Sequence, residues 1–308
     1  EYWPKDARII QVDINADRIG LTKRVSVGIQ GDARKVAEAI LANLSDTAGD
    51  EGRQERLDMV AHAKSRWAQE LSSMDHEEDD PGVDWNERAR KAHPDRMSAR
   101  MAWRAIMSAL PEEAIISTDI GNNCAIGNAY PMFEKGRKYL APGLFGPCGY
   151  GLPSILGAKI GCPDVPCVGF AGDGAFGISM NEMTACGRGE WPGITMVVFR
   201  NYQWGAEKRN STLWFDDNFV GTELNEGVEY AEIAKACGLE GVKVSTMEET
   251  SEALRAAIDA QMKDNVTTLI EVVLNQELGE PFRRDAMKKP VHVAGIRAED
   301  MRPQQPSL

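Results

Sequence analysis

The sequence predicts an α/β protein built on a doubly wound parallel sheet, preceded by the end of another α/β domain. Between residues 96 and 290, short apolar runs alternate with segments of helical periodicity. This alternation is typical of a parallel sheet that carries helices on both faces. In addition, the turn Gly172-Asp173-Gly174 closely follows one apolar run, and Asn201 ends the next one. This order of strand, turn, helix and strand predicts a βαβ unit.

A chain of 308 residues is long enough for about two domains. Composition and periodicity divide it into the C-terminal end of an α/β domain (1–45), a charged linker (46–95), the doubly wound domain (96–290) and a C-terminal tail (291–308). Within the linker we expect some helix at 55–72. The acidic run at 75–80 is interpreted as a solvated connection rather than a metal site.

The first part begins with a buried strand predicted at 7–14 and a turn at 15–19, followed by a second strand at 25–30. Asp32 is a suitable N-cap for a helix at 33–44, because its carboxylate accepts hydrogen bonds from backbone N–H groups of the first turn. The segment lacks the elements that would cover its first strand on both faces. We therefore expect the tail of a larger domain.

The doubly wound domain contains all the remaining predicted elements. Apolar runs predict strands at 114–118, 165–170, 196–201, 241–244 and 267–274. Helical patterns occupy 98–110, 152–161, 179–189, 228–237 and 247–263. Because strands and helices alternate throughout, the strands are expected to be parallel.

Two polar side chains end neighbouring strands of the predicted βαβ unit. Asp173 follows the first strand and Asn201 closes the second, so both are expected at the carboxyl edge of the sheet, where open α/β sheets place ligands. A carboxylate, an amide oxygen and a nearby carbonyl suit Mg²⁺ or Ca²⁺, with diphosphate oxygens completing the coordination. The flanking glycines allow close approach of phosphates. The alternative is an ordinary tight turn in a doubly wound domain.

Composition argues against several classes of protein. The formal charge of -12 and the pI of about 5.0 do not fit a nucleic-acid-binding surface. We see neither an apolar run long enough to span a membrane nor a signal-peptide core at the N-terminus. The six cysteines form no Cys-x-x-Cys pair and the four histidines lie far from the glycine turn. We expect a cytoplasmic protein with free thiols, and neither a zinc hydrolase nor a Ser-His-Asp enzyme.

The glycine turn, the 26 residues that follow it and Asn201 resemble the cofactor motif of thiamine diphosphate (ThDP)-dependent enzymes. The resemblance implies that Asp173, Asn201 and the main-chain carbonyl of Gln203 bind Mg²⁺. It also implies that ThDP binds together with Mg²⁺, with the ThDP diphosphate close to the glycine turn. The residues of this turn expected to meet ThDP are Gly172, Asp173, Gly174 and Ala175.

Three other segments support the same resemblance. Residues 143–153 resemble the loop that holds ThDP in a bent shape, which implies cofactor contacts for Gly146 and Cys148; family members usually have a bulky apolar residue where Cys148 stands. Residues 118–123 resemble a strand-end loop that reaches the diphosphate. The residues implied there are Gly121, Asn122 and Asn123. Residues 9–44 resemble the end of the Rossmann-like middle domain of the acetohydroxyacid synthase-like branch.

Within this branch, residues 200–210 resemble acetyltransferases that convert sulfoacetaldehyde and phosphate into acetyl phosphate and sulfite. Both substrates are small anions, so the acidic chain needs local positive charge. Lys208 and Arg209 follow the metal-binding strand end and are candidates to bind sulfonate or phosphate. The alternative for these two residues is a solvated charge pair at a helix start.

In this branch a Glu from a separate pyrimidine-binding domain activates ThDP, often across a dimer interface. We assign that Glu to no residue of this chain and therefore expect a homodimer or homotetramer that includes further sequence. Two other functions stay open at this point. One is a 2-oxoacid decarboxylase or acetohydroxyacid synthase-like carboligase on the same scaffold. The other is a non-catalytic cofactor-binding half of a two-part enzyme.

Overall fold

The computed structural model divides the chain into two compact units, Glu1–Glu70 and Leu71–Leu308. The structure describes residues 6–44, 52–73, 84–133, 138–278, 292–293 and 296–297. The predicted acidic run at 75–80 lies outside these residues.

The first unit contains a small parallel pair of strands. Strand β1 (Ile10–Asp13) pairs with β2 (Val27–Gln30), with the short helix η1 (Ala16–Arg18) between them. Helix α1 (Ala33–Ala42) begins at Asp32, whose carboxylate accepts a hydrogen bond from the backbone N–H of Lys35, as predicted. The prediction that the first strand is buried is wrong for this chain: β1 is half-buried at most, because no described element covers both of its faces.

Helix α2 (Arg53–Ser73) follows and extends past the boundary between the two units. It has no buried residue among those described. The helix expected at 55–72 is thus confirmed, while the assignment of 1–45 to the end of a middle domain stays a prediction.

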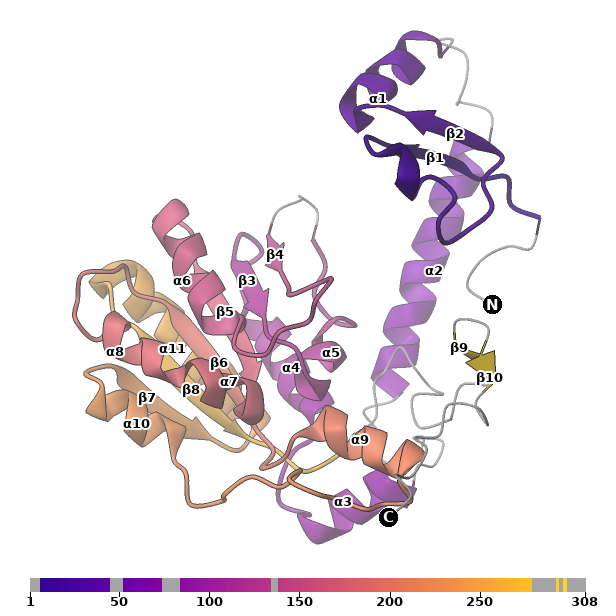
Figure 1. Cartoon of the computed structure of the whole chain (residues 1–308). Helices are drawn as coiled ribbons and strands as arrows, with labels where there is room; N and C mark the ends of the chain where they lie inside the picture. The colour runs from indigo at the N-terminus through magenta and orange to yellow at the C-terminus, as the bar shows by residue number, and fades with distance from the viewer. Residues whose placement is uncertain are drawn as a thin grey trace. The chain divides into compact units, whose positions relative to one another are not determined.

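The second unit is a doubly wound α/β domain (Figure 1). Its parallel six-stranded sheet has the order β4-β3-β5-β6-β8-β7. The strands are β3 (Ile115–Thr118), β4 (Tyr139–Leu140), β5 (Cys167–Gly172), β6 (Thr195–Arg200), β7 (Glu240–Val244) and β8 (Thr268–Val273). The main helices are α4 (Ala99–Ala109), α6 (Gly151–Gly161), α10 (Tyr230–Ala236) and α11 (Met247–Asp264). The predicted fold class is confirmed.

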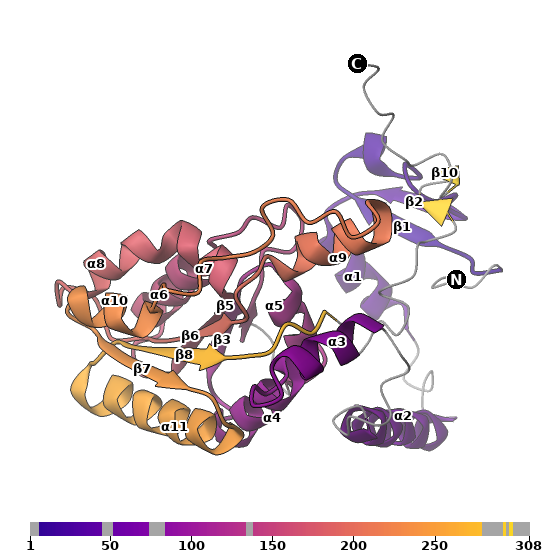
Figure 2. The same ribbon diagram turned by 90° about the horizontal axis from the view of Figure 1, so that it is seen from below.

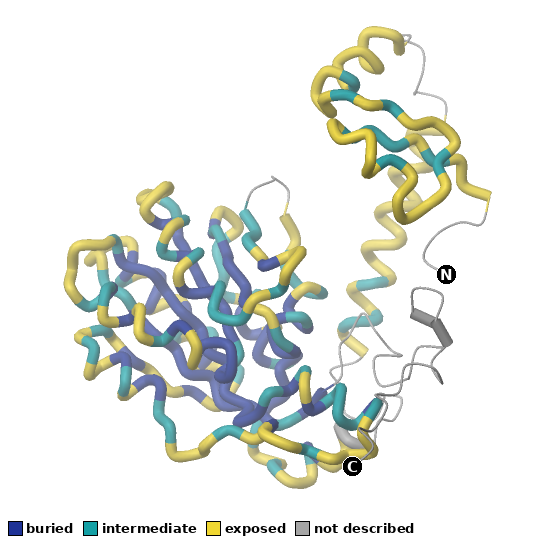
Figure 3. Tube along the Cα trace, viewed as in Figure 1, coloured by how far each residue is buried: buried dark blue, intermediate teal, exposed yellow. Residues whose placement is uncertain are grey.

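Helices cover both faces of the sheet (Figure 2). Side chains that alternate along β6 enter two separate cores. Val197 and Phe199 pack with residues of α4 and α11, whereas Met196 and Val198 pack with residues of α6 and α10. The central strands are therefore buried on both sides (Figure 3), which explains why they are continuous apolar runs in the sequence.

Several elements differ from the sequence-based prediction. The helix expected at 179–189 begins earlier: α7 (Asp173–Ser179) starts directly after β5 and continues through η2 (Met180–Glu182) into α8 (Met183–Cys186). The glycines in this stretch hide the helix from a propensity argument. Three further helices were not predicted, namely α3 (Asp84–Ala92) inside the expected linker, α5 (Asn122–Gly127) and α9 (Gly205–Trp214). The expected tail includes β9 (His292–Val293) and β10 (Ile296–Arg297), which pair antiparallel.

Candidate functional site

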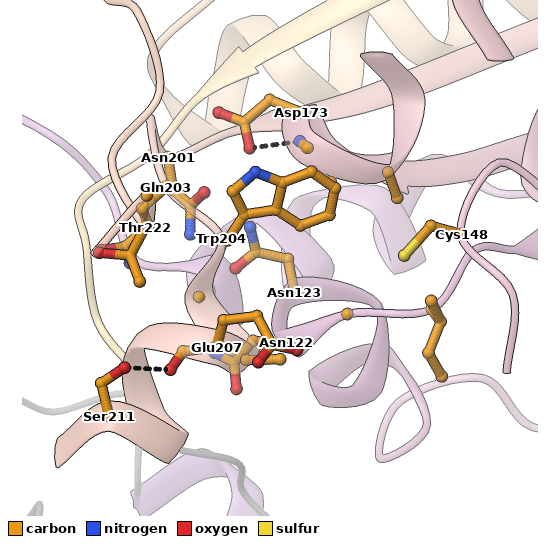
Figure 4. Close-up of a pocket in the computed structure, with 18 of the residues that line it drawn as sticks. Asn122, Asn123, Cys148, Asp173, Asn201, Gln203, Trp204, Glu207, Ser211 and Thr222 are labelled. Carbon is orange, nitrogen blue, oxygen red and sulfur yellow. Dashed lines mark hydrogen bonds between the residues drawn. The ribbon is translucent and has the colours of Figure 1, made fainter. Parts of the chain in front are cut away.

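The expected ligand site lies at the carboxyl edge of the sheet. Strands β5 and β6 are parallel neighbours with Gly172 paired to Phe199, so Asp173 and Asn201 leave the sheet side by side, as predicted. They line a cavity of about 580 Å³ (Figure 4). The lining residues are 120–123, 146, 148, 172–175, 201, 203–207, 211 and 220–222. All eleven residues that the sequence predicts to contact the cofactor belong to this lining; their individual roles stay predictions.

Asp173 is held by three donors. Its Oδ2 accepts hydrogen bonds from Arg200 Nη1 at 3.0 Å and from the backbone N–H of Tyr202 at 2.7 Å, and its Oδ1 accepts one from the backbone N–H of Gly174 at 3.0 Å. The residue is only 1% exposed. Burial raises the pKa of Asp173 to about 6, although the Arg200 guanidinium favours the ionised form. The carboxylate therefore has a fixed orientation, with Oδ1 on the side of Asn201.

The side-chain amide of Asn201 lies between two other oxygens. One of its terminal atoms is 3.2 Å from Asp173 Oδ1 and 3.1 Å from the carbonyl oxygen of Gln203. With the amide nitrogen in this place, the three groups form hydrogen bonds. With the amide oxygen there, three oxygens converge, and this donor set suits a hard divalent cation. No group of three His, Cys, Asp or Glu side chains among the described residues offers an alternative metal site.

The backbone turns sharply between Asn201 and Gln203. Tyr202 has a φ of 60°, in the left-handed region that bulky residues rarely occupy. Its ring is buried between two guanidinium groups, 4.7 Å from Arg96 and 4.1 Å from Arg200. These contacts fix the turn that brings the Gln203 carbonyl beside Asn201. Sequence reasoning missed this arrangement, since Arg96 and Tyr202 are far apart in the chain.

A buried carboxylate organises the glycine-rich segment beside the cavity. Asp119 accepts hydrogen bonds from the backbone N–H groups of Ile120, Gly149 and Gly151, at 2.9, 3.0 and 2.7 Å. Burial raises the pKa of Asp119, while these hydrogen bonds oppose the rise. Because Gly149 has a φ of 84°, a side chain there would be strained. Asp119 was not among the predicted site residues, although it precedes Gly121 in the predicted diphosphate loop.

Some buried polar atoms in the cavity wall have no partner among the described residues. Both the nitrogen and the oxygen of the Asn122 side chain are unpaired, as is Gln203 Oε1. Unpaired buried polar groups are destabilising, so these atoms fit a polar ligand. The wall also contains Trp204, which packs so closely on Gly174 that a Cβ atom there would lie 2.8 Å from the indole.

The two substrate candidates lie outside the cavity lining. Lys208 is buried, with its Nζ 2.5 Å from Glu223 Oε1 and 5.2 Å from the ring centre of Phe219. Lys208 is therefore not a solvated charge, which the sequence had left open as the alternative to substrate binding. Arg209 likewise is not a lining residue. Helix α9 instead turns Glu207 and the next-turn residue Ser211 toward the cavity, since positions i and i+4 share one face of a helix.

Comparison with known families defines the class of protein. A family model described as "Thiamine pyrophosphate enzyme, C-terminal TPP binding domain" matches residues 119–272. The chain belongs to this family of ThDP enzymes and includes its C-terminal cofactor-binding domain. ThDP is thus its cofactor, as the sequence motif predicted.

The particular relatives are named sulfoacetaldehyde acetyltransferase. The chain is 75% identical over 99% of its length to the protein of that name from Roseovarius nubinhibens, and 71% identical over 99% to that from Rhodobacter capsulatus. It spans about half the length of these curated relatives, 50% and 51% respectively. A Rhodococcus jostii ThDP-dependent 4-hydroxybenzoylformate decarboxylase has the same fold, with a TM-score of 0.64 and 20% identity over 90% of this chain and 46% of that chain. In the part of the chain that the structure describes, no helix is long and apolar enough to cross a membrane.

Proposed function

We propose that this chain is the cofactor-binding half of an enzyme that converts sulfoacetaldehyde and phosphate into acetyl phosphate and sulfite. The observation that carries the proposal is the 75% identity, over 99% of the chain, to a protein named for this activity. At this level of identity the wall of the cavity is expected to be shared. The cavity itself offers the donors that a ThDP enzyme needs at this sheet edge.

Asp173, Asn201 and the Gln203 carbonyl would hold Mg²⁺. Asp173 Oδ1 and the Gln203 carbonyl oxygen lie 3.2 and 3.1 Å from one terminal atom of the Asn201 amide. With the amide oxygen at that place, one cation can contact all three oxygens. The unpaired Asn122 side chain would bind the diphosphate, and the Asp119 carboxylate would keep the glycine-rich segment in place. When ThDP is bound, its thiazolium ring serves as the electron sink for cleavage next to the carbonyl carbon.

Further parts of the proposed enzyme lie beyond the described cavity. Leu144 and Phe145, in the same segment as Gly146, are 104% and 92% exposed. Exposed neighbouring apolar side chains beside a cavity favour a docking partner, and we assign this place to the pyrimidine-binding domain of a homodimer or homotetramer. That domain would supply the activating Glu. A cytoplasmic location fits the six free cysteines.

Product analysis tests the proposal. The native full-length protein, with ThDP and Mg²⁺, is incubated with sulfoacetaldehyde and phosphate, and in parallel with pyruvate. We expect equal amounts of acetyl phosphate and sulfite, formed only when phosphate is present. Turnover of pyruvate alone would instead support the decarboxylase or carboligase alternative. Cofactor binding without turnover of either substrate would support the non-catalytic alternative.

A further inference from the structure

Glu207 is a solvent-exposed residue that belongs to the lining of the cofactor cavity. It lies in the first turn of α9 and belongs to the cavity lining, one helical turn before Ser211 (Figure 4). Ser211 Oγ donates to the backbone carbonyl of Glu207, not to its carboxylate. Among the described residues, the Glu207 carboxylate has neither a hydrogen bond nor an ion pair. The adjacent Lys208 is buried and pairs with Glu223 instead.

A negative charge at this place needs an explanation, because the proposed reaction brings two anions into the same cavity. Like charges repel, and the repulsion is strongest where protein replaces water. An acidic residue in the first turn of a helix does stabilise the helix dipole modestly. That role does not require a place in the cavity lining, so the position of the exposed Glu207 beside the cavity calls for a further role.

Few side chains that this chain contributes to the cavity lining are acids or bases. Of the lining residues, only Cys148, Asp173 and Glu207 have such side chains. Asp173 already accepts three hydrogen bonds and faces the proposed metal ligands. Burial raises the pKa of the Cys148 thiol, and the nearby carboxylates of Asp119 and Glu207 raise it further. A raised pKa disfavours the thiolate, so Glu207 is the stronger candidate for a base among the lining residues of this chain.

The proposed reaction, on which this inference rests, requires two proton movements on the substrate. Sulfoacetaldehyde and hydrogen phosphate become acetyl phosphate and hydrogen sulfite. The carbon–sulfur bond breaks and sulfite leaves with its electron pair; a bond forms between the carbonyl carbon and a phosphate oxygen. The aldehyde carbon loses its hydrogen as a proton, the neighbouring methylene gains a proton to become a methyl group, and the proton released by phosphate ends on sulfite. Atoms and charges balance without an oxidant or reductant.

We propose that Glu207 is the catalytic base and acid of this reaction, which takes the proton from the aldehyde carbon and delivers a proton to the methylene carbon. The two carbons are bonded neighbours, so one carboxylate on one face of the substrate reaches both. General acid–base catalysis by a positioned side chain accelerates a step by about 10²–10⁴-fold.

The test compares E207Q and E207D in the native full-length protein with a matched control, E226Q, which changes an exposed glutamate outside the cavity lining. ThDP affinity is measured by quenching of tryptophan fluorescence in the presence of Mg²⁺. For E207Q we expect ThDP affinity within about threefold of the parent, but a kcat lower by about 10²–10⁴-fold with little change in KM. We also expect a larger isotope effect with sulfoacetaldehyde deuterated at the aldehyde carbon. E207D should keep part of the activity that E207Q loses, because it retains a carboxylate.

Three outcomes would overturn the inference. The first is a kcat of E207Q within about threefold of the parent, which would mean that another group moves the proton. The second is a loss of kcat in E207Q that equals its loss of ThDP affinity, which indicates a structural role. The third is an equal effect in E226Q. Absence of turnover in the parent would contradict the proposed function itself, whereas an active parent with an active E207Q contradicts only the role of Glu207.

Discussion

At the residue scale, the cavity depends on how Asp173 is ionised and oriented. Arg200, itself 1% exposed, donates to the carboxylate and also to the carbonyls of Asn225 and Val228. This buried guanidinium holds one oxygen of Asp173, while the other remains on the side of Asn201. The metal site therefore needs only one charged ligand, because the surrounding network fixes the positions of the neutral ones.

The first prediction concerns protons and metal at Asp173. Burial raises the pKa of Asp173 in the folded, metal-free protein to about 6. The protonated carboxyl therefore stabilises the fold below about pH 4, and this stabilisation is lost as the pH rises through about 6. Mg²⁺ binds the ionised form, so its apparent affinity should be about tenfold weaker at pH 5 than at pH 7. Titration of Mg²⁺ at saturating ThDP measures this change in affinity.

The variant D173N should lose metal-dependent ThDP binding, while the exposed-site control D164N should keep the parental dependence of Mg²⁺ affinity on pH. An unchanged Mg²⁺ affinity in D173N would contradict the assignment.

The second prediction separates two interpretations of Lys208 and Arg209. If they bind sulfonate or phosphate, as the sequence suggested, alanine at either position should raise the KM of one substrate about ten- to a hundredfold. The ion pair with Glu223 favours a structural role for Lys208 instead. K208A would then lower the free energy of unfolding by about 1–3 kcal/mol and leave both KM values within about threefold. Steady-state assays that vary each substrate, together with urea denaturation, distinguish these results.

At the element scale, the carboxyl ends of β5 and β6 place the metal-binding candidates next to each other. Both strands were predictable from the sequence. Their continuous apolar runs identify two buried strands, and parallel order then places Asp173 and Asn201 at one edge. The start of α7 at Asp173 was not predictable from propensity, because Gly174 and Gly177 lower the helix propensity of this short segment. Helix α9 was missed because its sequence is largely polar, and the burial of Lys208 against Glu223 is known only once the fold is known.

The contact between the glycine turn and α9 gives the third prediction. A Cβ at Gly174 would lie 2.8 Å from the Trp204 ring, whereas a Cβ at Gly157 in α6 meets nothing within 4 Å. G174A should displace Trp204, narrow the cavity and weaken ThDP binding by at least about tenfold, equivalent to about 1.4 kcal/mol. G157A should leave ThDP binding unchanged and stabilise the protein by about 0.5–1 kcal/mol. Equal ThDP affinity in parent and G174A would show that Trp204 moves without consequence for the cofactor.

At the scale of the whole molecule, the described residues form a doubly wound domain with a six-stranded sheet and a smaller unit with a two-stranded sheet. The cavity and its wall lie in the doubly wound domain. The small unit has exposed apolar side chains, including Ile10 at 63% and Leu41 at 71%. Its sequence predicted strands and a helix but no independent core. The activating Glu could not be predicted from this chain, because the resemblance assigns that residue to another domain.

The fourth prediction follows from this division. The 308-residue chain alone should show little or no turnover of sulfoacetaldehyde and should self-associate through exposed side chains such as Leu144 and Phe145. The native full-length protein, assayed beside it, should be active. Light scattering and product analysis measure the two properties. Full activity of the 308-residue chain would mean that the activating group lies within it.

A crystal structure of the native full-length protein with ThDP and Mg²⁺ tests the metal site directly. We expect one cation between Asp173 Oδ1, the Asn201 amide oxygen and the Gln203 carbonyl, at about 2.0–2.1 Å from each. Diphosphate oxygens of ThDP should complete its coordination, and replacement by Mn²⁺ should give an anomalous peak at the same position. A cation bound elsewhere, or ThDP bound outside the cavity of residues 120–222, would contradict the account.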